Sequence, residues 1–591
     1  MNISSRRFAL LFLAASAAFG QGIPQNPAYV PGPDAQVKPG VPKGKVIKFT
    51  YDTSPVLPGT SRAVSVYIPA QYDGSKPACV MVYQDGAGYV SETGGSRATI
   101  VMDNLIAEGS MPVTVGIFVD PGVTAGLMPD QMARYHRSLE YDGLGDRYAR
   151  FLIEDLIPEV EKRASVKIST NADDRGLIGG SSGGIAAYVA AWEMPDSFHR
   201  VISYIGSFTN LRGGDTLASW IRKFEPKPLR IFMQDGSNDQ SIYSGSWFLA
   251  NQEIYASLEY AGYDAKFVIG TEGHSGRHGG SILPEALRWA WREYPKPIVA
   301  SKGGPGVRQY VTDFLDPAAD WELVGQGYGS VEATAVDKAG ILHFSDTKSG
   351  RIYRLGADGR PAVFKENSAS TGLMFGPDGR LYAAQPSKKR IVSWGSDGTE
   401  QVVAQGVEAH DLAVTSKGLI YFTDPSARRV WLLDTDKKKR VVFQSTADNN
   451  IGYLAGIQIS SDEHLVNVTD RDSRWVWSMQ IGADNGLQYA MPFHHLESQD
   501  DTQVTRAAGM AIDTTGHMFV ATTLGIQICD QPGRVVGVVR KPQPGPVSAV
   551  VFGGEGLHTL YATAGDKVFA RKMRRTGTLP WQPVKLPRPQ L

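Results

Sequence analysis

Cysteine is almost absent from this 591-residue chain, which contains only Cys79 and Cys529, one in each half. Two cysteines cannot build a disulfide framework or a multi-cysteine metal site. The chain is therefore neither a disulfide-rich scaffold nor a protein whose metal is held by several cysteines. We expect each thiol to be a small, buried apolar side chain.

An excess of charge of either sign is also missing, because 60 Lys and Arg balance 60 Asp and Glu. A chain without a basic region lacks the electrostatic footprint of a nucleic-acid or anionic-membrane binder. We therefore expect a small or neutral molecule as the partner and no nucleic acid. The composition does not determine the oligomeric state.

No apolar run reaches the roughly 20 residues that a membrane-spanning helix needs, so no membrane span is predicted. The longest run near the N-terminus, residues 8–19, follows Arg6 and Arg7 and ends near the small residues Ala18 and Gly20. This order is typical of a secretory signal peptide. We predict a signal peptide at 1–20 and a periplasmic or extracellular protein, and the export route stays open.

The first half alternates strand-like and helix-like segments, which indicates an α/β fold with a largely parallel sheet. We place this domain at 44–297, after an extended, poorly ordered lead-in at 21–43 that is rich in Pro and Gly. A linker without a sustained pattern follows at 298–320.

The second half repeats short strands every 40 to 50 residues, several of them preceded by an Asp-Gly, Lys-Gly or Thr-Gly turn. Such a period is typical of a β-propeller, and the repeats predict six blades over 321–575, before a tail at 576–591. The repeated strands are expected at 341–346, 381–385, 420–424, 465–470, 518–522 and 560–563.

A glycine- and serine-rich run at 179–184 lies between an apolar strand, 175–178, and an Ala-rich helical stretch. This context is typical of the nucleophile elbow of an α/β-hydrolase, whose tight turn excludes bulky residues two positions before and after the serine. The GxSxG pattern fits two registers, centred on Ser181 or on Ser182. The pattern alone does not choose between the two serines.

A serine nucleophile needs a histidine base and an orienting carboxylate, and in this fold class both follow the serine in the sequence. The acid candidates, Asp235 and Asp239, lie in the loop after the strand at 229–233. The base candidates, His274 and His278, follow the strand at 265–269.

The ten residues 175–184, RGLIGGSSGG, resemble the elbow phrase of the enterochelin-esterase and feruloyl-esterase-like group in the esterase D superfamily. The resemblance covers roughly 45–297 and includes the phrases at 140–142, 205–210 and 287–289. It implies an α/β-hydrolase with Ser181 as nucleophile, Asp239 as acid and His274 as base. Such an esterase requires no cofactor. The implied oxyanion donors are the backbone N–H groups of Ser182 and Ala87.

The second half resembles the SMP-30/gluconolactonase group of six-bladed propellers, through the phrases at 344–346, 421–425 and 552–554. Enzymes of that group hold a divalent cation in the central channel through oxygen and amide ligands. Here only Glu332 stands at a ligand position, because Ala455, Ala508 and His410 replace the expected Asn, Asp and Asn. This donor set argues against a divalent cation and against lactonase activity.

Together these features predict an exported serine hydrolase of carboxylic esters, acting on a small-molecule or saccharide-linked ester. The propeller is expected to assist recognition. Two alternatives remain at this point: a metal-dependent lactone hydrolase of the gluconolactonase type, and a binding protein without catalysis.

Overall fold

The computed structural model describes residues 29–128, 130–303, 310–499, 504–579 and 582. The signal peptide predicted at 1–20 lies outside these residues. Among the helices that are described, none is both long and apolar enough to cross a membrane.

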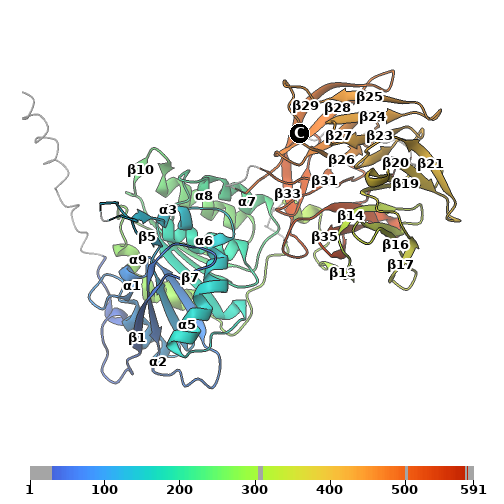
Figure 1. Ribbon diagram of the computed structural model, residues 1–591. Coiled ribbons are helices and arrows are strands. Elements are labelled where there is room, and N and C mark those ends of the chain that lie inside the picture. The colour runs from blue at the N-terminus through green and yellow to red at the C-terminus, as the bar shows by residue number, and fades with distance from the viewer. Residues whose placement is uncertain (1–28, 129, 304–309, 500–503, 580–581, 583–591) are drawn as a thin grey trace, which may run out of the picture.

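One eight-stranded mixed sheet forms the centre of the first half (Figure 1). Its first two strands run antiparallel to their neighbours, and the strands from β4 onward run parallel. The predicted α/β fold is confirmed, although β8 was not predicted. In spatial order the strands are β1 (Lys45–Tyr51), β2 (Arg62–Ile68), β4 (Thr114–Val119), β3 (Cys79–Gln84), β7 (Arg175–Gly180), β8 (Arg200–Tyr204), β9 (Arg230–Gly236) and β12 (Asp264–Gly270).

Helices bury both faces of this sheet, because the parallel strands carry apolar side chains on each side. The helices on one face are α5 (Ile157–Ala164), α6 (Ser182–Glu193), α7 (Leu217–Lys223) and α8 (Trp247–Tyr260). Those on the other face are α2 (Ala98–Ala107) and α10 (Leu283–Trp291). The core of this domain therefore consists of two layers, one on each face of the sheet.

The described part of the lead-in is packed against the domain, which corrects the expectation of a poorly ordered segment. A short 3-10 helix at Pro33–Ala35 lies beside α2. The Asn104 side chain donates hydrogen bonds to the carbonyls of Asp34 and Gln36, at 2.8 and 2.9 Å. The low complexity of this segment concealed these specific contacts.

The second half is a ring of six four-stranded antiparallel sheets, so the predicted six-bladed propeller is confirmed. The ring closes because β13 (Glu322–Gln326) pairs with β36 (Lys567–Lys572), which joins the two ends of the domain in one blade. The repeated strands correspond to β15 (Leu342–Asp346), β19 (Leu381–Gln385), β23 (Ile420–Asp424), β27 (Leu465–Asp470), β31 (Met518–Ala521) and β35 (Thr559–Ala564).

The two domains meet where α7 lies beside β33 (Val535–Val539) (Figure 1). Backbone pairing joins Phe224 to Val538, and the partly buried Glu225 carboxylate forms a two-bonded ion pair with the buried Arg571. The second half of the predicted linker also differs from the expectation, because Val311 is fully buried against the propeller.

Candidate active site

Ser181 lies at the sharp turn between β7 and α6, at the carboxyl end of a central parallel strand. Its backbone has φ 56° and ψ −124°, a conformation that non-glycine residues rarely adopt. The turn is held by a 2.9 Å hydrogen bond from Ser181 N–H to the Tyr204 carbonyl. Such a strained turn exposes the side-chain oxygen at the edge of the sheet.

The glycines around this turn distinguish the two possible registers. A Cβ on Gly179 would lie 2.2 Å from the Gly183 carbonyl oxygen, so the turn cannot close with any side chain there. A Cβ on Gly180 would meet nothing closer than 3.7 Å. The tight crossing is therefore centred on Ser181, midway between Gly179 and Gly183.

Three of the predicted side chains come together at this edge of the sheet. His274 Nε2 lies 2.9 Å from Ser181 Oγ, and His274 Nδ1 lies 2.7 Å from Asp239 Oδ1. The Asp239 side chain is fully buried, whereas the imidazole is partly exposed. Hydroxyl, imidazole and carboxylate thus form one hydrogen-bonded chain, an arrangement that can transfer a proton from the serine.

The alternative residues lie in other environments. Ser182 Oγ accepts a hydrogen bond from Arg137 at 3.1 Å. His278 contacts Gln234 at 3.0 Å and stacks on Tyr29, and burial lowers the pKa of its imidazole. Among the described residues, neither side chain forms a hydrogen bond with Ser181.

Asp235, the alternative acid, is fully buried and lies behind Asp239. Burial, a hydrogen bond with Asp239 and charge repulsion from Asp239 together raise the pKa of its carboxyl to about 8. One Asp235 oxygen accepts a hydrogen bond from Gly236 N–H at 2.6 Å. Asp235 is therefore a neutral acid at pH 7 while the neighbouring Asp239 contacts the histidine.

The two expected oxyanion donors differ. Ser182 is the first residue of α6, so its N–H has no acceptor within the helix and lies next to the Ser181 side chain. Ala87, at the start of α1 (Ala87–Val90), already donates its N–H to Asp120 Oδ1 at 3.0 Å. Since that N–H is occupied, the expectation for Ala87 is not supported in this arrangement.

Several side chains near Ser181 had no assigned role in the sequence. Arg137, on α3 (Arg137–Tyr141), forms a two-bonded ion pair with Asp85, at 2.9 and 2.8 Å, and also reaches Ser182. The Trp247 indole packs edge-on against the His274 ring and donates to Ser207 Oγ at 3.1 Å. Arg137 lies just before the family phrase at 140–142, and Ser207 lies within the phrase at 205–210. These phrases were the sequence signal that could have identified them.

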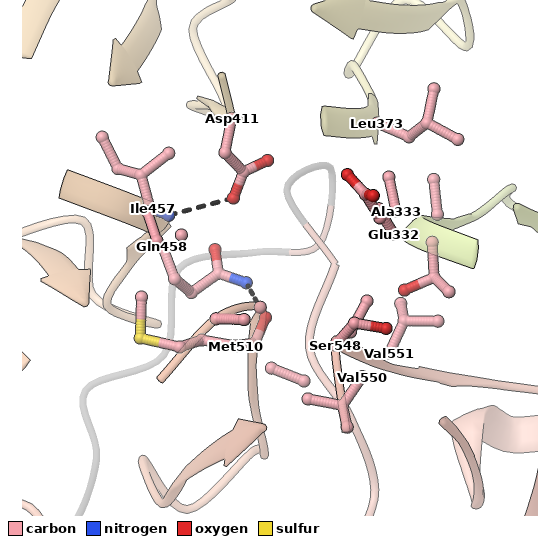
Figure 2. Close-up of a pocket in the computed structure, with 18 of the residues that line it drawn as sticks. Glu332, Ala333, Leu373, Asp411, Ile457, Gln458, Met510, Ser548, Val550 and Val551 are labelled. Carbon is pink, nitrogen blue, oxygen red and sulfur yellow. Dashed lines mark hydrogen bonds between the residues drawn. The ribbon is translucent and has the colours of Figure 1, made fainter. Parts of the chain in front are cut away.

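The central channel of the propeller contains a cavity of about 600 Å³. Its walls are mostly apolar, with Leu373, Ile457 and Met510 among the lining residues (Figure 2). Asp411 lies in the wall and accepts a hydrogen bond from Ile457 N–H at 3.0 Å. Burial raises the pKa of the Asp411 carboxyl to about 7.

The cavity does not offer the ligands of a divalent cation. Glu332 is present, but one of its oxygens accepts hydrogen bonds from Ser330 and Thr347, both at 3.1 Å. Ala455 and Ala508, which line the same cavity, have no ligand atoms. Among the residues with described positions, no three His, Cys, Asp or Glu side chains gather as a metal site requires. The residues here do not fit the cation of the gluconolactonase group.

Comparison with known proteins assigns the two halves separately. A family model described as "Putative esterase" matches residues 54–246, and one described as "SMP-30/Gluconolactonase/LRE-like region" matches 332–566. The first match includes Ser181 and Asp239 and stops before His274.

Individual relatives are distant. The chain is 23% identical to the uncharacterized protein YbbA of Bacillus subtilis over 210 residues, which are 34% of this chain and 80% of YbbA. A gluconolactonase from Xanthomonas campestris is 18% identical, with a TM-score of 0.40, over 45% of this chain and 93% of its own. The enterobactin esterase of Shigella flexneri is 23% identical, with a TM-score of 0.35, over 46% of this chain and 64% of its own.

Proposed function

We propose that this protein is an exported serine hydrolase of carboxylic esters, acting through Ser181, His274 and Asp239. The proposal is supported by the Esterase family domain and above all by the 2.9 Å contact between Ser181 Oγ and His274 Nε2. The substrate is a small-molecule or saccharide-linked ester. No cofactor is required, because the histidine supplies the base.

The reaction has two steps. His274 Nε2 takes the proton of Ser181 Oγ as this oxygen attacks the ester carbonyl carbon, and the oxyanion faces the Ser182 N–H. The intermediate collapses with breakage of the ester C–O bond, and the alcohol leaves with the proton from His274. Water then attacks the acyl-serine, His274 accepts its proton and returns it to Ser181, and the carboxylic acid is released.

Asp239 stabilises the imidazolium that forms in both steps. Its carboxylate accepts the Nδ1–H of His274 at 2.7 Å, which fixes the tautomer and leaves Nε2 free to act as a base. The buried position of Asp239 makes this contact stronger than one in water.

The propeller contributes recognition in this proposal. Its cavity of about 600 Å³ has the size and apolar lining of a small-molecule site. Its residues do not fit the metal-dependent lactonase chemistry of its family, so we place the reaction in the first domain.

The test is hydrolysis of a small chromogenic ester, together with covalent labelling by a fluorophosphonate. Ser181→Ala should lower kcat by at least about 10³-fold and abolish labelling. Ser182→Ala removes the alternative hydroxyl but keeps the backbone N–H, so labelling should persist at one adduct per chain. Unchanged turnover in Ser181→Ala would refute the proposal.

The two histidines are distinguished in the same assay. His274→Ala should lower kcat by about 10²- to 10⁴-fold, the usual contribution of a positioned base. His278→Asn should retain most of the turnover, because its imidazole contacts Gln234 and Tyr29. The opposite result would reassign the base to His278.

A further inference from the structure

Several exposed apolar side chains lie on segments that are connected to the proposed catalytic residues. Leu127, Met132 and Tyr243 are 94%, 92% and 91% exposed, although large apolar residues are usually at least partly covered. We call the whole set the apolar rim, and its members are Leu127, Met128, Met132, Tyr135, Leu139, Ile242, Tyr243 and Leu249.

One side of the apolar rim is joined to the histidine. Ile242 and Tyr243 belong to a hairpin made by β10 (Ser241–Ile242) and β11 (Gly245–Ser246). This hairpin connects Asp239 to Trp247, whose ring lies 5.6 Å from that of His274. Leu249 follows in the first turn of α8.

The other side is joined to the oxyanion end of the site. Tyr135 ends the hairpin of β5 (Val123–Thr124) and β6 (Arg134–Tyr135), whose connection carries Leu127 and Met132. Arg137 follows at the start of α3 and donates to Ser182 Oγ at 3.1 Å. Leu139 lies on the same short helix.

The loop that contains Asn210 and Arg212 connects the two sides of the rim. Asn210 N–H donates to the Ser244 carbonyl at 3.0 Å, and Arg212 Nε donates to Ser138 Oγ at 3.4 Å. These bonds join the two hairpins, α3 and the start of α8, and Figure 1 shows β10, α3 and α8 near one another at the upper end of the first domain. Ser181 is joined to these segments through His274 on one side and through Ser182 on the other.

The propeller carries exposed apolar residues in a different pattern. They lie on the outer strands of separate blades, such as Val363 on β17 (Pro361–Lys365), Val402 on β21 (Glu400–Gln405) and Val441 on β25 (Lys439–Gln444). Scattered exposed apolar residues are ordinary, whereas a contiguous group marks a binding surface. Among the described residues, the apolar rim is the group of exposed apolar side chains that borders the proposed site.

We infer that the apolar rim receives the apolar part of the ester, so that the enzyme prefers substrates with a large aliphatic or aromatic group over acetyl esters. This inference rests on the proposed function, since the rim borders the proposed nucleophile. Covering such a group against the rim removes apolar surface from water on both partners. Only a substrate that is large enough to extend from Ser181 to the rim gains from this contact.

The test compares esters of rising size with the full-length protein, each below its micelle concentration. One series runs from 4-nitrophenyl acetate through butyrate to octanoate, and 4-nitrophenyl benzoate represents aromatic acids. Acetate esters of 1-naphthol and benzyl alcohol place the apolar group on the alcohol side. We expect kcat/KM to rise by up to about fourfold for each methylene that becomes covered, in at least one series.

Variants on opposite sides of the rim locate the effect. Met132→Ser and Tyr243→Ser should each lower the ratio of kcat/KM for the preferred large ester to that for acetate. Tyr489→Ser, which alters an exposed tyrosine on β29 (Leu487–His495) of the propeller, should leave this ratio unchanged.

A flat dependence on ester size in every series, or an unchanged ratio in both rim variants, would overturn the inference. Binding of the protein to lipid vesicles that depends on Tyr243, combined with a flat ester series, would also overturn it by making the rim a membrane contact. Failure of the proposed function has a separate signature, which is retention of acetate hydrolysis by Ser181→Ala.

Discussion

Asp235, on β9, and Asp239, in the loop that follows, are two neighbouring buried carboxyl groups that differ in their partners. Asp239 contacts His274, whereas Asp235 has no basic partner among the described residues. Each of the two side chains retains one buried oxygen without a hydrogen-bond donor. A proton held by Asp235 supplies the missing donor, and it leaves a single negative charge beside the histidine.

This pair predicts an alkaline limit of ester hydrolysis. The pKa of Asp235 is raised to about 8, so its carboxyl is protonated below that pH and ionised above it. Ionisation removes the hydrogen bond to Asp239 and places two repelling carboxylates side by side, which disturbs the carboxylate that orients His274. We expect kcat/KM to fall above about pH 8. Asp235→Asn keeps a neutral donor without a titrating group, so its plateau should extend to higher pH.

Asp103→Asn serves as the matched control for this pH profile. Burial also raises the pKa of the Asp103 carboxyl, but this residue lies on α2 and contacts Tyr67 and Gly44 N–H. Its variant should keep the wild-type alkaline limit. If Asp235→Asn and the wild type show the same profile, Asp235 does not control the titration.

A pair of adjacent glycines gives a prediction for the turn. Gly179→Ala places a methyl group 2.2 Å from the Gly183 carbonyl, so the turn must open and Ser181 must move. We expect a loss of about 2 to 4 kcal/mol in the free energy of unfolding and a large loss of turnover. Gly180→Ala makes only ordinary van der Waals contacts, the nearest at 3.7 Å, and should be tolerated. Thermal unfolding and ester hydrolysis measure both effects, and equal effects of the two substitutions would contradict the assigned register.

The sequence predicted both folds because each of them has a repeated sequence pattern. Alternating strands and helices indicated the parallel sheet, and the strands of the repeat correspond to the second strand of each blade, from β15 to β35. Strand β8 escaped prediction because Arg200 and Ser203 interrupt its apolar character. Their burial at the centre of the sheet is a property of the packed domain.

The sequence predicted the central side chains of the site and missed several of the contacts around them. The elbow phrase and the order of acidic residue and histidine identified the side chains that the fold brings together, because those constraints are local. The ion pair of Arg137 with Asp85 joins segments far apart in the sequence, and the use of the Ala87 N–H depends on where Asp120 lies. Neither contact follows from local patterns. The same limit applies to the lead-in, whose composition gives no indication of its docking on α2.

The propeller cavity predicts that divalent cations have no part in ester hydrolysis. Treatment with a chelator should leave turnover unchanged, and elemental analysis should find well below one divalent ion per chain. Glu332→Gln should alter neither turnover nor the response of Tm to Ca²⁺, because Glu332 lacks the partner ligands of a metal site. A Ca²⁺-dependent rise in Tm that the Glu332→Gln variant loses would contradict this prediction.

The contact between the domains predicts a strong effect of a single carboxylate. Glu225 accepts hydrogen bonds from Arg571 at 2.9 and 2.7 Å, and the Arg571 side chain is 5% exposed. Glu225→Ala leaves this guanidinium buried without its partner, which costs about 3 to 5 kcal/mol. We expect calorimetry to show a lower Tm and a separation of the unfolding of the two domains.

Two further variants test whether stability is lost because a charge is left buried without a partner or because an ion pair of any kind is removed. Glu366→Ala breaks an exposed pair with Arg351, which is worth no more than about 1 kcal/mol, so its effect on Tm should be small. Combining Glu225→Ala with Arg571→Met removes both charges and should recover part of the lost stability, because no unpaired charge stays buried. If Glu225→Ala unfolds like Glu366→Ala, the ion pair with Arg571 does not hold the domains together, and the other contacts between them carry that role.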